Sequence, residues 1–100
     1  MTRIEFDWDP AKARSNQAKH AVSFEDAMGV FADPLALSRL DDDLGVGEER
    51  WVTLGMAPAA ARLLLVVHTH VELSGDSIAV RIISARPATR REARQYEEGR

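Results

Sequence analysis

The chain contains no cysteine, no long apolar segment and few aromatic side chains. The absence of cysteine excludes disulfides, a thiolate nucleophile and zinc or iron–sulfur sites ligated by cysteine. The longest apolar run, Leu63 to Val67, is far too short to cross a bilayer, and the first ten residues lack the layout of a secretory signal. Glycine-rich phosphate loops and the HExxH and GxSxG motifs are absent as well. We therefore expect a cytoplasmic protein without membrane contact, metal or other cofactor.

The composition that remains predicts one small folded domain over residues 1–100. Of the 100 residues, 45% are hydrophobic and 29% are charged, which excludes a disordered or low-complexity chain. The formal net charge of −3 argues weakly against a nucleic-acid partner, because phosphate backbones favour a basic surface.

The net charge hides an uneven distribution along the chain. Residues 1–20 carry a net charge of +1 and residues 50–100 carry +3, whereas residues 21–49 hold eight acidic side chains and one basic, a net charge of −7. Arginine supplies 11 of the 13 basic residues, and its planar guanidinium suits bidentate contact with phosphate or carboxylate. The acidic and the basic segments are therefore expected to form two separate surfaces.

Hydrophobic periodicity and turn residues predict the order of the elements. We predict a strand over 3–8, helices over 10–20 and from 23 to 32, a strand over 35–40, an acidic turn over 41–47, strands over 50–56, 63–73 and 78–85, and a helix from 90 to about 98. Asp9, Ser23 and Thr89 are the expected N-caps of the three helices. The first helix has a poor apolar face, so it is either lightly packed or contacts a partner. This order predicts an α+β fold: an antiparallel sheet of about four strands plus a short N-terminal strand, two N-terminal helices and one C-terminal helix.

Two histidines, His68 and His70, are candidates for acid–base chemistry. Their spacing places both on one face of the central strand, and imidazole titrates near neutral pH. The competing interpretation is that one of them is packed or hydrogen-bonded and that the other lies near the end of the strand. Metal binding is disfavoured because no third ligand is evident.

The dense cationic region of the sequence begins in the last strand. Arg81 lies among β-branched residues, where a guanidinium needs solvent, an anionic ligand or an ion pair across the sheet. The candidates that follow it are Arg86, Arg90, Arg91, Arg94 and Tyr96, of which the last could pack, stack on a base or donate a hydrogen bond. A solvated helix face is the competing interpretation.

A smaller set of candidates lies elsewhere in the chain. Lys12, Lys19 and His20 cluster along the first predicted helix, and Glu49 and Arg50 adjoin a predicted strand. Arginine, histidine and a nearby carboxylate suit RNA cleavage without a metal. A base deprotonates the ribose 2′-hydroxyl, arginine stabilises the charged phosphorane, and an acid protonates the leaving 5′-oxygen.

Read in order, four segments resemble the BrnT toxin family: Phe6 to Pro34, Gly47 to Trp51, Leu63 to His70 and Val80 to Glu98. The most specific pieces are WDPAKARSNQAKH, VSFEDA, RIISAR and TRREARQYEE. The resemblance implies a RelE-like fold and a ribonuclease toxin of a type II toxin–antitoxin system that arrests translation and growth. It also implies a BrnA-type antitoxin with a ribbon-helix-helix domain. DNA is then contacted only through the antitoxin, and we expect a heterotetramer built around an antitoxin dimer.

Under this hypothesis the candidate residues take separate roles. Arg81 and Arg86 contact the scissile phosphate, His70 or His68 transfers protons, and Glu49 and Tyr96 are second-rank catalytic candidates. RNA binding falls to Lys12, Lys19, His20, Arg50, Arg90, Arg91 and Arg94.

The chain departs from the family pattern at two positions. Ala21 stands where the family usually has glycine, which predicts a different or strained end of the first helix. His70 stands where the family commonly has arginine, which removes a permanent charge and bidentate geometry. The second departure favours the alternative function, a catalytically weak homologue that mainly binds an antitoxin or acts as a co-repressor.

Overall fold

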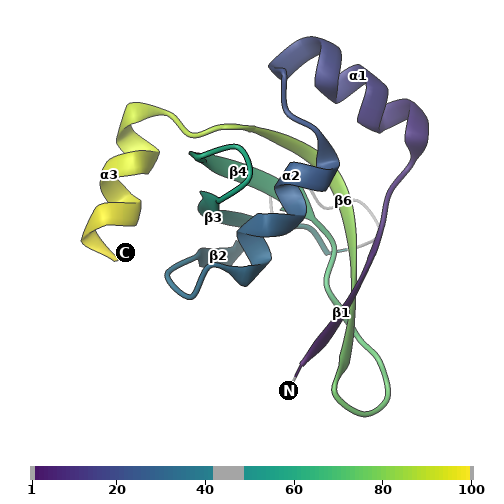
Figure 1. Ribbon diagram of the computed structural model, residues 1–100. Coiled ribbons are helices and arrows are strands. Elements are labelled where there is room, and N and C mark those ends of the chain that lie inside the picture. The colour runs from purple at the N-terminus through teal and green to yellow at the C-terminus, as the bar shows by residue number, and fades with distance from the viewer. Residues whose placement is uncertain (1, 42–48, 100) are drawn as a thin grey trace.

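The computed structural model describes residues 2–41 and 49–99. Along the chain the elements are β1 (Arg3–Asp7), α1 (Pro10–His20), α2 (Phe24–Met28), a 3-10 helix η1 (Gly29–Ala32), β2 (Leu37–Leu40), β3 (Trp51–Ala57), β4 (Arg62–His68), β5 (Val71–Glu72), β6 (Ser77–Pro87) and α3 (Arg90–Glu98) (Figure 1). The predicted α+β class is confirmed. Most of the acidic turn predicted over 41–47 lies outside the described residues.

The strands form one sheet in the order β1-β6-β4-β3-β2, and β5 pairs with β6. The prediction of an antiparallel sheet was wrong for β1, which pairs in parallel with β6 in the register Arg3↔Ser77 to Asp7↔Arg81. The single strand predicted over 63–73 is divided into β4 and β5, with a register shift between Val67 and His68. The sheet is therefore mixed.

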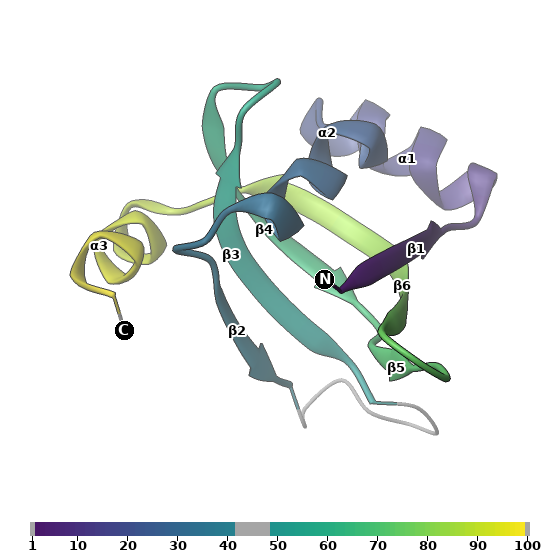
Figure 2. The same cartoon turned by 60° about the horizontal axis from the view of Figure 1, so that its bottom comes forward.

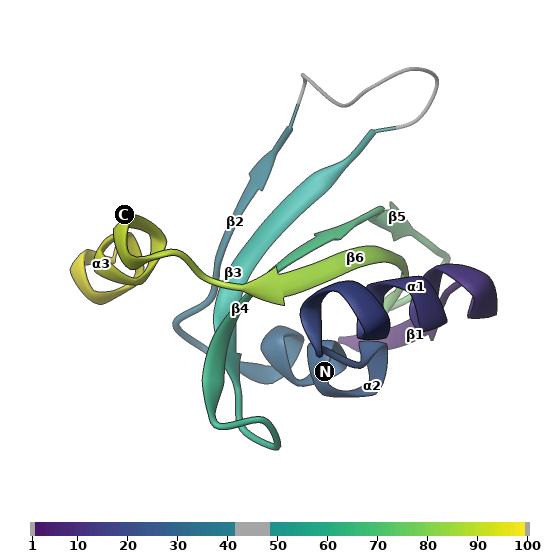
Figure 3. The same ribbon diagram turned by 90° about the horizontal axis from the view of Figure 1, so that it is seen from above.

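Alternate side chains of the sheet face two different environments. Figures 2 and 3 show α1 and α2 beside one face of the sheet. Leu64 and Val66 lie in the buried core with Phe24 and Ala85. Leu65, between them, points to the opposite face, where it lines a pocket beside α3. No helix within the described residues is long and apolar enough to span a membrane.

The three helices begin at the predicted caps. The side chains of Asp9, Ser23 and Thr89 accept hydrogen bonds from the first-turn amides of α1, α2 and α3. Thr89 and Glu92 complete a capping box, in which each side chain bonds to the backbone of the other residue. These local signals explain why the helix starts could be predicted.

Helix α1 is anchored to the sheet by one polar side chain, Asn16, which is 6% exposed. Its Nδ2 donates to the carbonyl oxygens of Val22 (3.0 Å) and Ala85 (2.8 Å), and its Oδ1 accepts from the amide of Ala85 (3.1 Å). β1 pairs with β6 only as far as Arg81. At Ala85, the side-chain amide of Asn16 makes the hydrogen bonds that a neighbouring strand would otherwise make. A polar anchor thus compensates for the poor apolar face of the helix.

The end of α1 is fixed by an unusual turn. Ala21 adopts the left-handed conformation (φ 56°, ψ 37°), and its amide donates to the carbonyl of Gln17. Arg62, at the start of β4, donates from its guanidinium to the carbonyl of Ala21 (2.7 Å). The predicted strain at this position is confirmed, since a left-handed conformation is costly for alanine.

Replacing Asn16 by alanine is expected to lower the free energy of unfolding by about 3 kcal/mol, because buried backbone groups of Val22 and Ala85 lose their partners. Urea denaturation of the full chain measures this. Gln17→Ala, at the next and exposed position of α1, is the matched control and should change stability by less than about 0.5 kcal/mol. Equal stability of the two variants would contradict the anchoring role.

Ala21→Gly is expected to raise the free energy of unfolding by about 1 kcal/mol, because glycine adopts the left-handed conformation without steric cost. Ala18→Gly, in the exposed middle of the same helix, should lower it by about 0.5–1 kcal/mol. Opposite signs for the two substitutions in thermal or urea denaturation are the expected result, and a destabilised Ala21→Gly chain would refute the interpretation.

Candidate functional site

Two adjoining pockets form a groove between α1 and the open face of β6, which we name the basic groove. One pocket, of about 210 Å³, is lined by Lys12, Ser15, Asn16, Lys19, His20, Ile83 and Ser84. The other, of about 190 Å³, is lined by Asp9, Lys12, Arg50, Arg81, Ile82 and Ile83. Lys12 and Ile83 line both, so the two pockets adjoin each other. The groove therefore brings together five of the predicted site residues from three separate parts of the sequence.

Helical geometry explains one wall of the basic groove. Lys12, Ser15, Lys19 and His20 are spaced by three, four and one residues, which places them along one face of α1 beside Asn16. Because Asn16 holds this face against Ala85, the cationic side chains are positioned relative to β6. Both lysines of the chain lie here, and among the described residues no carboxylate lines the pocket that contains His20. This end of the groove can accept an anion such as a phosphate group.

At the other end of the groove, Arg81 forms an ion pair with Asp7 of β1 (3.2 Å). This confirms the ion pair across the sheet that the sequence left open as one alternative. The side chains of Arg81 and Asp7 are 47% and 71% exposed, so solvent screens their attraction and the pair contributes little to stability. The guanidinium of Arg81 is therefore accessible to a competing phosphate.

Arg86 is held more firmly, and it does not line the basic groove. Its two terminal nitrogens donate to the two carboxylate oxygens of Glu92 at 2.9 Å each, and one also donates to the carbonyl of Pro87. The hydrogen bonds from Arg86 hold the pKa of Glu92 below its usual range, and the carboxylate raises the pKa of Arg86. In this structure Arg86 joins α3 to the end of β6.

Tyr96 makes the second polar contact of α3. Its hydroxyl donates to Oδ2 of Asp33 (2.6 Å), which also accepts from the amide of Met56 (2.8 Å). The amide of Met56 and then the hydroxyl of Tyr96 lower the pKa of Asp33, whereas Asp33 raises the pKa of Tyr96. The sequence allowed Tyr96 to pack, to stack on a base or to donate a hydrogen bond, and in the structure it donates a hydrogen bond.

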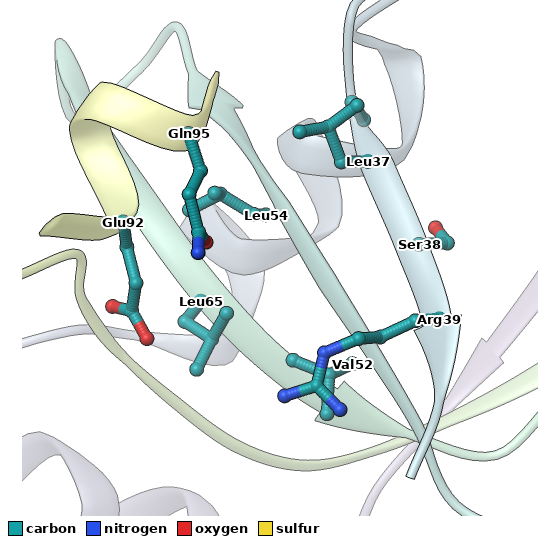
Figure 4. A pocket seen from close by; sticks show the side chains of 9 residues that line it. Leu37, Ser38, Arg39, Val52, Leu54, Leu65, Glu92 and Gln95 are labelled. Carbon is teal, nitrogen blue, oxygen red and sulfur yellow. The ribbon is translucent and has the colours of Figure 1, made fainter. Parts of the chain in front are cut away.

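Beneath α3 lies an apolar pocket of about 320 Å³ that is separate from the basic groove. Figure 4 shows Leu54 and Leu65 on its floor, Glu92 and Gln95 of α3 on one side, and Arg39 of β2 on the other. Its lining includes none of the candidate catalytic residues, and the carboxylate of Glu92 is already bound by Arg86. This pocket lacks the cluster of cations that a phosphate site needs.

His68 lies in the protein interior, 2% exposed, with both ring nitrogens engaged. Nδ1 contacts the carbonyl oxygen of Thr69 (2.8 Å), and because a carbonyl only accepts, Nδ1 carries the proton. Nε2 then accepts from the hydroxyl of Thr53 (2.7 Å), and the ring of Phe31 packs edge-on at 4.8 Å. Burial lowers the pKa of His68, and the Thr69 carbonyl opposes this only in part. Of His68 and His70, His68 is therefore the histidine that is packed and hydrogen-bonded.

The remaining candidates are scattered. His70 follows β4, half-buried, with its ring 5.8 Å from that of Trp51, and Glu49 is exposed just before β3. The arginines Arg90, Arg91 and Arg94 are exposed on α3, which lies at the opposite side of the sheet from α1 (Figure 1). Within the described residues, no group of three or more histidine and carboxylate side chains could hold a metal ion. The predicted RNA-binding set is therefore divided between two surfaces.

Sequence reasoning missed the serines of the groove and the role of Asn16. Ser15 and Ser84 line the pocket beside the lysines, and Asn16 fixes its wall. The helical spacing of Asn16 from Lys12 and His20, four residues on each side, is the sequence signal that could have placed it on the same face. Its partner Ala85 could not have been found, since nothing local connects the two.

The fold and the groove define a small α+β protein with a basic, helix-flanked surface, a kind of surface that binds the phosphates of nucleic acids. A family model described as the ribonuclease toxin BrnT of type II toxin–antitoxin systems matches residues 8–92. The match covers most of the chain, so the protein belongs to this family, and the resemblance found in the sequence is confirmed. Membership implies ribonuclease activity and an antitoxin partner. A comparison with curated proteins found no match.

Burial of His68 predicts a stability that depends on pH. Its pKa in the folded chain is lowered from the ordinary 6.5, so the unfolded chain binds the proton more readily. The stabilisation is complete above about pH 6.5 and is lost as the pH falls through the folded pKa. Urea denaturation between about pH 5 and 8 should show this decline.

Two substitutions distinguish His68 from the other titrating groups. His68→Gln should flatten the decline of the unfolding free energy, since glutamine does not titrate, whereas His70→Gln should leave most of it in place. If the unfolding free energy of His68→Gln depended on pH as that of the wild type does, the buried neutral imidazole would not be the origin of this dependence.

Proposed function

We propose that the protein is a ribonuclease toxin that cleaves RNA in the basic groove without a metal ion, and so inhibits translation and growth. The observation that carries this proposal is that Lys12, Lys19 and His20 of α1 line one groove with Arg81 of β6 and with Arg50, which precedes β3. Arg81 binds a phosphate of the RNA at one end of the groove, the lysines stabilise the charge that develops on the phosphorane, and a histidine moves the proton.

The charge of the groove supports cleavage without a metal. A divalent cation would enter a site already occupied by two ammonium groups and two guanidinium groups, and Coulomb repulsion opposes this. Among the described residues, Asp9, which lines the groove, accepts from the amide of Ala11, and Asp7 beside it pairs with Arg81. Cationic side chains supply the electrostatic stabilisation that a metal provides in other nucleases.

The partner we propose is a BrnA-type antitoxin with a ribbon-helix-helix domain. A heterotetramer with an antitoxin dimer fits a toxin whose own chain shows no DNA-binding motif, since the antitoxin then makes the DNA contact. An acidic segment of the antitoxin would cover the basic groove and neutralise the cations on which RNA binding depends. Cytoplasmic action follows from the same proposal, because the RNA targets of translation arrest are located there.

Expression of the chain alone in a bacterium tests the proposed function. The wild-type chain should arrest growth and degrade RNA, and the fragments should end in 2′,3′-cyclic phosphate and 5′-hydroxyl groups. Arg81→Ala should lower the cleavage rate by about 100-fold and relieve the arrest, because it removes a cation that holds the RNA phosphates in the groove.

Two controls separate charge at the groove from general effects. Arg14→Ala removes an exposed cation of α1 that does not line the groove and should remain toxic. Arg86→Ala and Glu92→Gln both break the ion pair of α3, so toxicity lost only in Arg86→Ala would assign a phosphate contact to Arg86 itself. Full toxicity of soluble Arg81→Ala would contradict its assignment.

The second candidate function is a catalytically weak homologue that mainly binds the antitoxin or acts as a co-repressor. Two observations favour it: His70 replaces an arginine of the family pattern, and both Arg81 and Arg86 are paired with carboxylates. Normal growth and intact RNA, with soluble protein verified, would support this function in place of the first.

A further inference from the structure

The described chain holds three histidines, and their surroundings differ sharply. Cleavage that begins at a ribose 2′-hydroxyl needs a group that takes up a proton near neutral pH and that can touch the RNA. His68 fails the second condition, because its ring is buried and both nitrogens are bonded to the protein. His70 follows the end of β4 against Trp51 and does not line the basic groove.

His20 is the histidine that lines the basic groove. It is half-buried at the last position of α1, in the pocket that also contains Lys19, Lys12 and Ser84. The adjacent Lys19 and the more distant Lys12 supply positive charge on the same helix face, where a phosphate would lie next to the imidazole. Proton acceptor and phosphate-binding cations are thus neighbours at this end of the groove.

The backbone around His20 is held from both sides, which is unusual for the exposed end of a helix. One turn earlier, Asn16 bonds to Ala85 of β6 and to Val22 beyond the helix. On the other side, Ala21 takes a strained left-handed conformation, and its carbonyl accepts from Arg62. Strain of this kind persists where the surrounding structure imposes it, and it commonly accompanies functional sites. The contacts of Asn16 and of Arg62 therefore fix the direction in which the side chain of His20 projects from α1.

We infer that His20 is the residue that takes the proton of the ribose 2′-hydroxyl, in place of His68 or His70; the inference rests on the proposed ribonuclease function. The neutral imidazole accepts the proton while the 2′-oxygen bonds to phosphorus. The bond from phosphorus to the 5′-oxygen breaks, and the 5′-oxygen takes a proton from water. His20 returns its proton to the hydroxide that remains, which leaves a 2′,3′-cyclic phosphate and a 5′-hydroxyl.

The charged groups around His20 are cations. Lys12 and Lys19 face it from α1, Arg62 approaches the end of the helix from β4, and the groove residues of β6, Ile83 and Ser84, do not titrate. Among the described residues, no carboxylate lines this end of the groove. The negative charge that develops on the 2′-oxygen and on the phosphorane is therefore stabilised where His20 accepts the proton.

The experiment measures cleavage of total bacterial RNA by the purified full-length chain between about pH 5 and 8. His20→Ala is expected to cleave at least about 100-fold more slowly than the wild type, while RNA binding changes little. Added imidazole should restore part of the activity of His20→Ala, which a merely structural role would not allow. His20→Gln, which keeps a polar side chain but cannot act as a base, should lose the activity as well, whereas His70→Gln and His68→Gln should keep it.

Controls separate this inference from the proposed function. Gln17→Ala, an exposed substitution on the same helix outside the groove, should cleave as the wild type does, and circular dichroism should show His20→Ala folded. A wild type that cleaves and a folded His20→Ala that cleaves within a fewfold of it would overturn the inference alone. A folded wild type that cleaves no RNA would overturn the proposed function and the inference together.

Discussion

The side chain of Asn16 is the constraint on which the candidate site depends. One buried amide joins the helix α1, the start of the following segment at Val22 and the last strand at Ala85, three parts of the chain that no apolar stripe on α1 could hold together. A hydrogen bond contributes little net free energy when both partners can reach water, but a buried amide that loses its partner is costly. The geometry of the basic groove, with helix and strand as its two walls, follows from this single anchor.

Features that depend on neighbouring residues could be predicted from the sequence, whereas contacts between residues far apart in the sequence could not. Helix caps at Asp9 and Thr89 depend on residues two or three positions away, and those were found. The parallel pairing of β1 with β6 and the bond from Asn16 to Ala85 join residues about 70 positions apart, and no periodicity reports such contacts. The candidate site shows the same division: helical spacing gathered Lys12, Lys19 and His20, but only the fold brings Arg81 to them, and the roles of all four remain predictions.

The basic residues of the chain serve two purposes that composition could not separate. Arg86 joins α3 to the sheet through Glu92, and Arg62 caps the end of α1, so these guanidinium groups act as structural links. The two lysines are placed differently, since both line the basic groove, and Lys19 lies at the end where no described carboxylate is found. The acidic excess of residues 21–49 is partly structural as well, because Asp33 binds both Met56 and Tyr96. Net charge was therefore a poor guide to the partner.

The parallel pairing of β1 with β6 also has a consequence for the synthesis of the protein. The first strand and the first helix leave the ribosome early, yet their partners in β6 are among the last residues translated. Contacts this distant in sequence form late, because the intervening chain must be ordered first. A nascent or truncated chain that ends before Ser84 lacks one wall of the groove. A chain that is still being made therefore lacks the proposed site, which only the finished molecule holds.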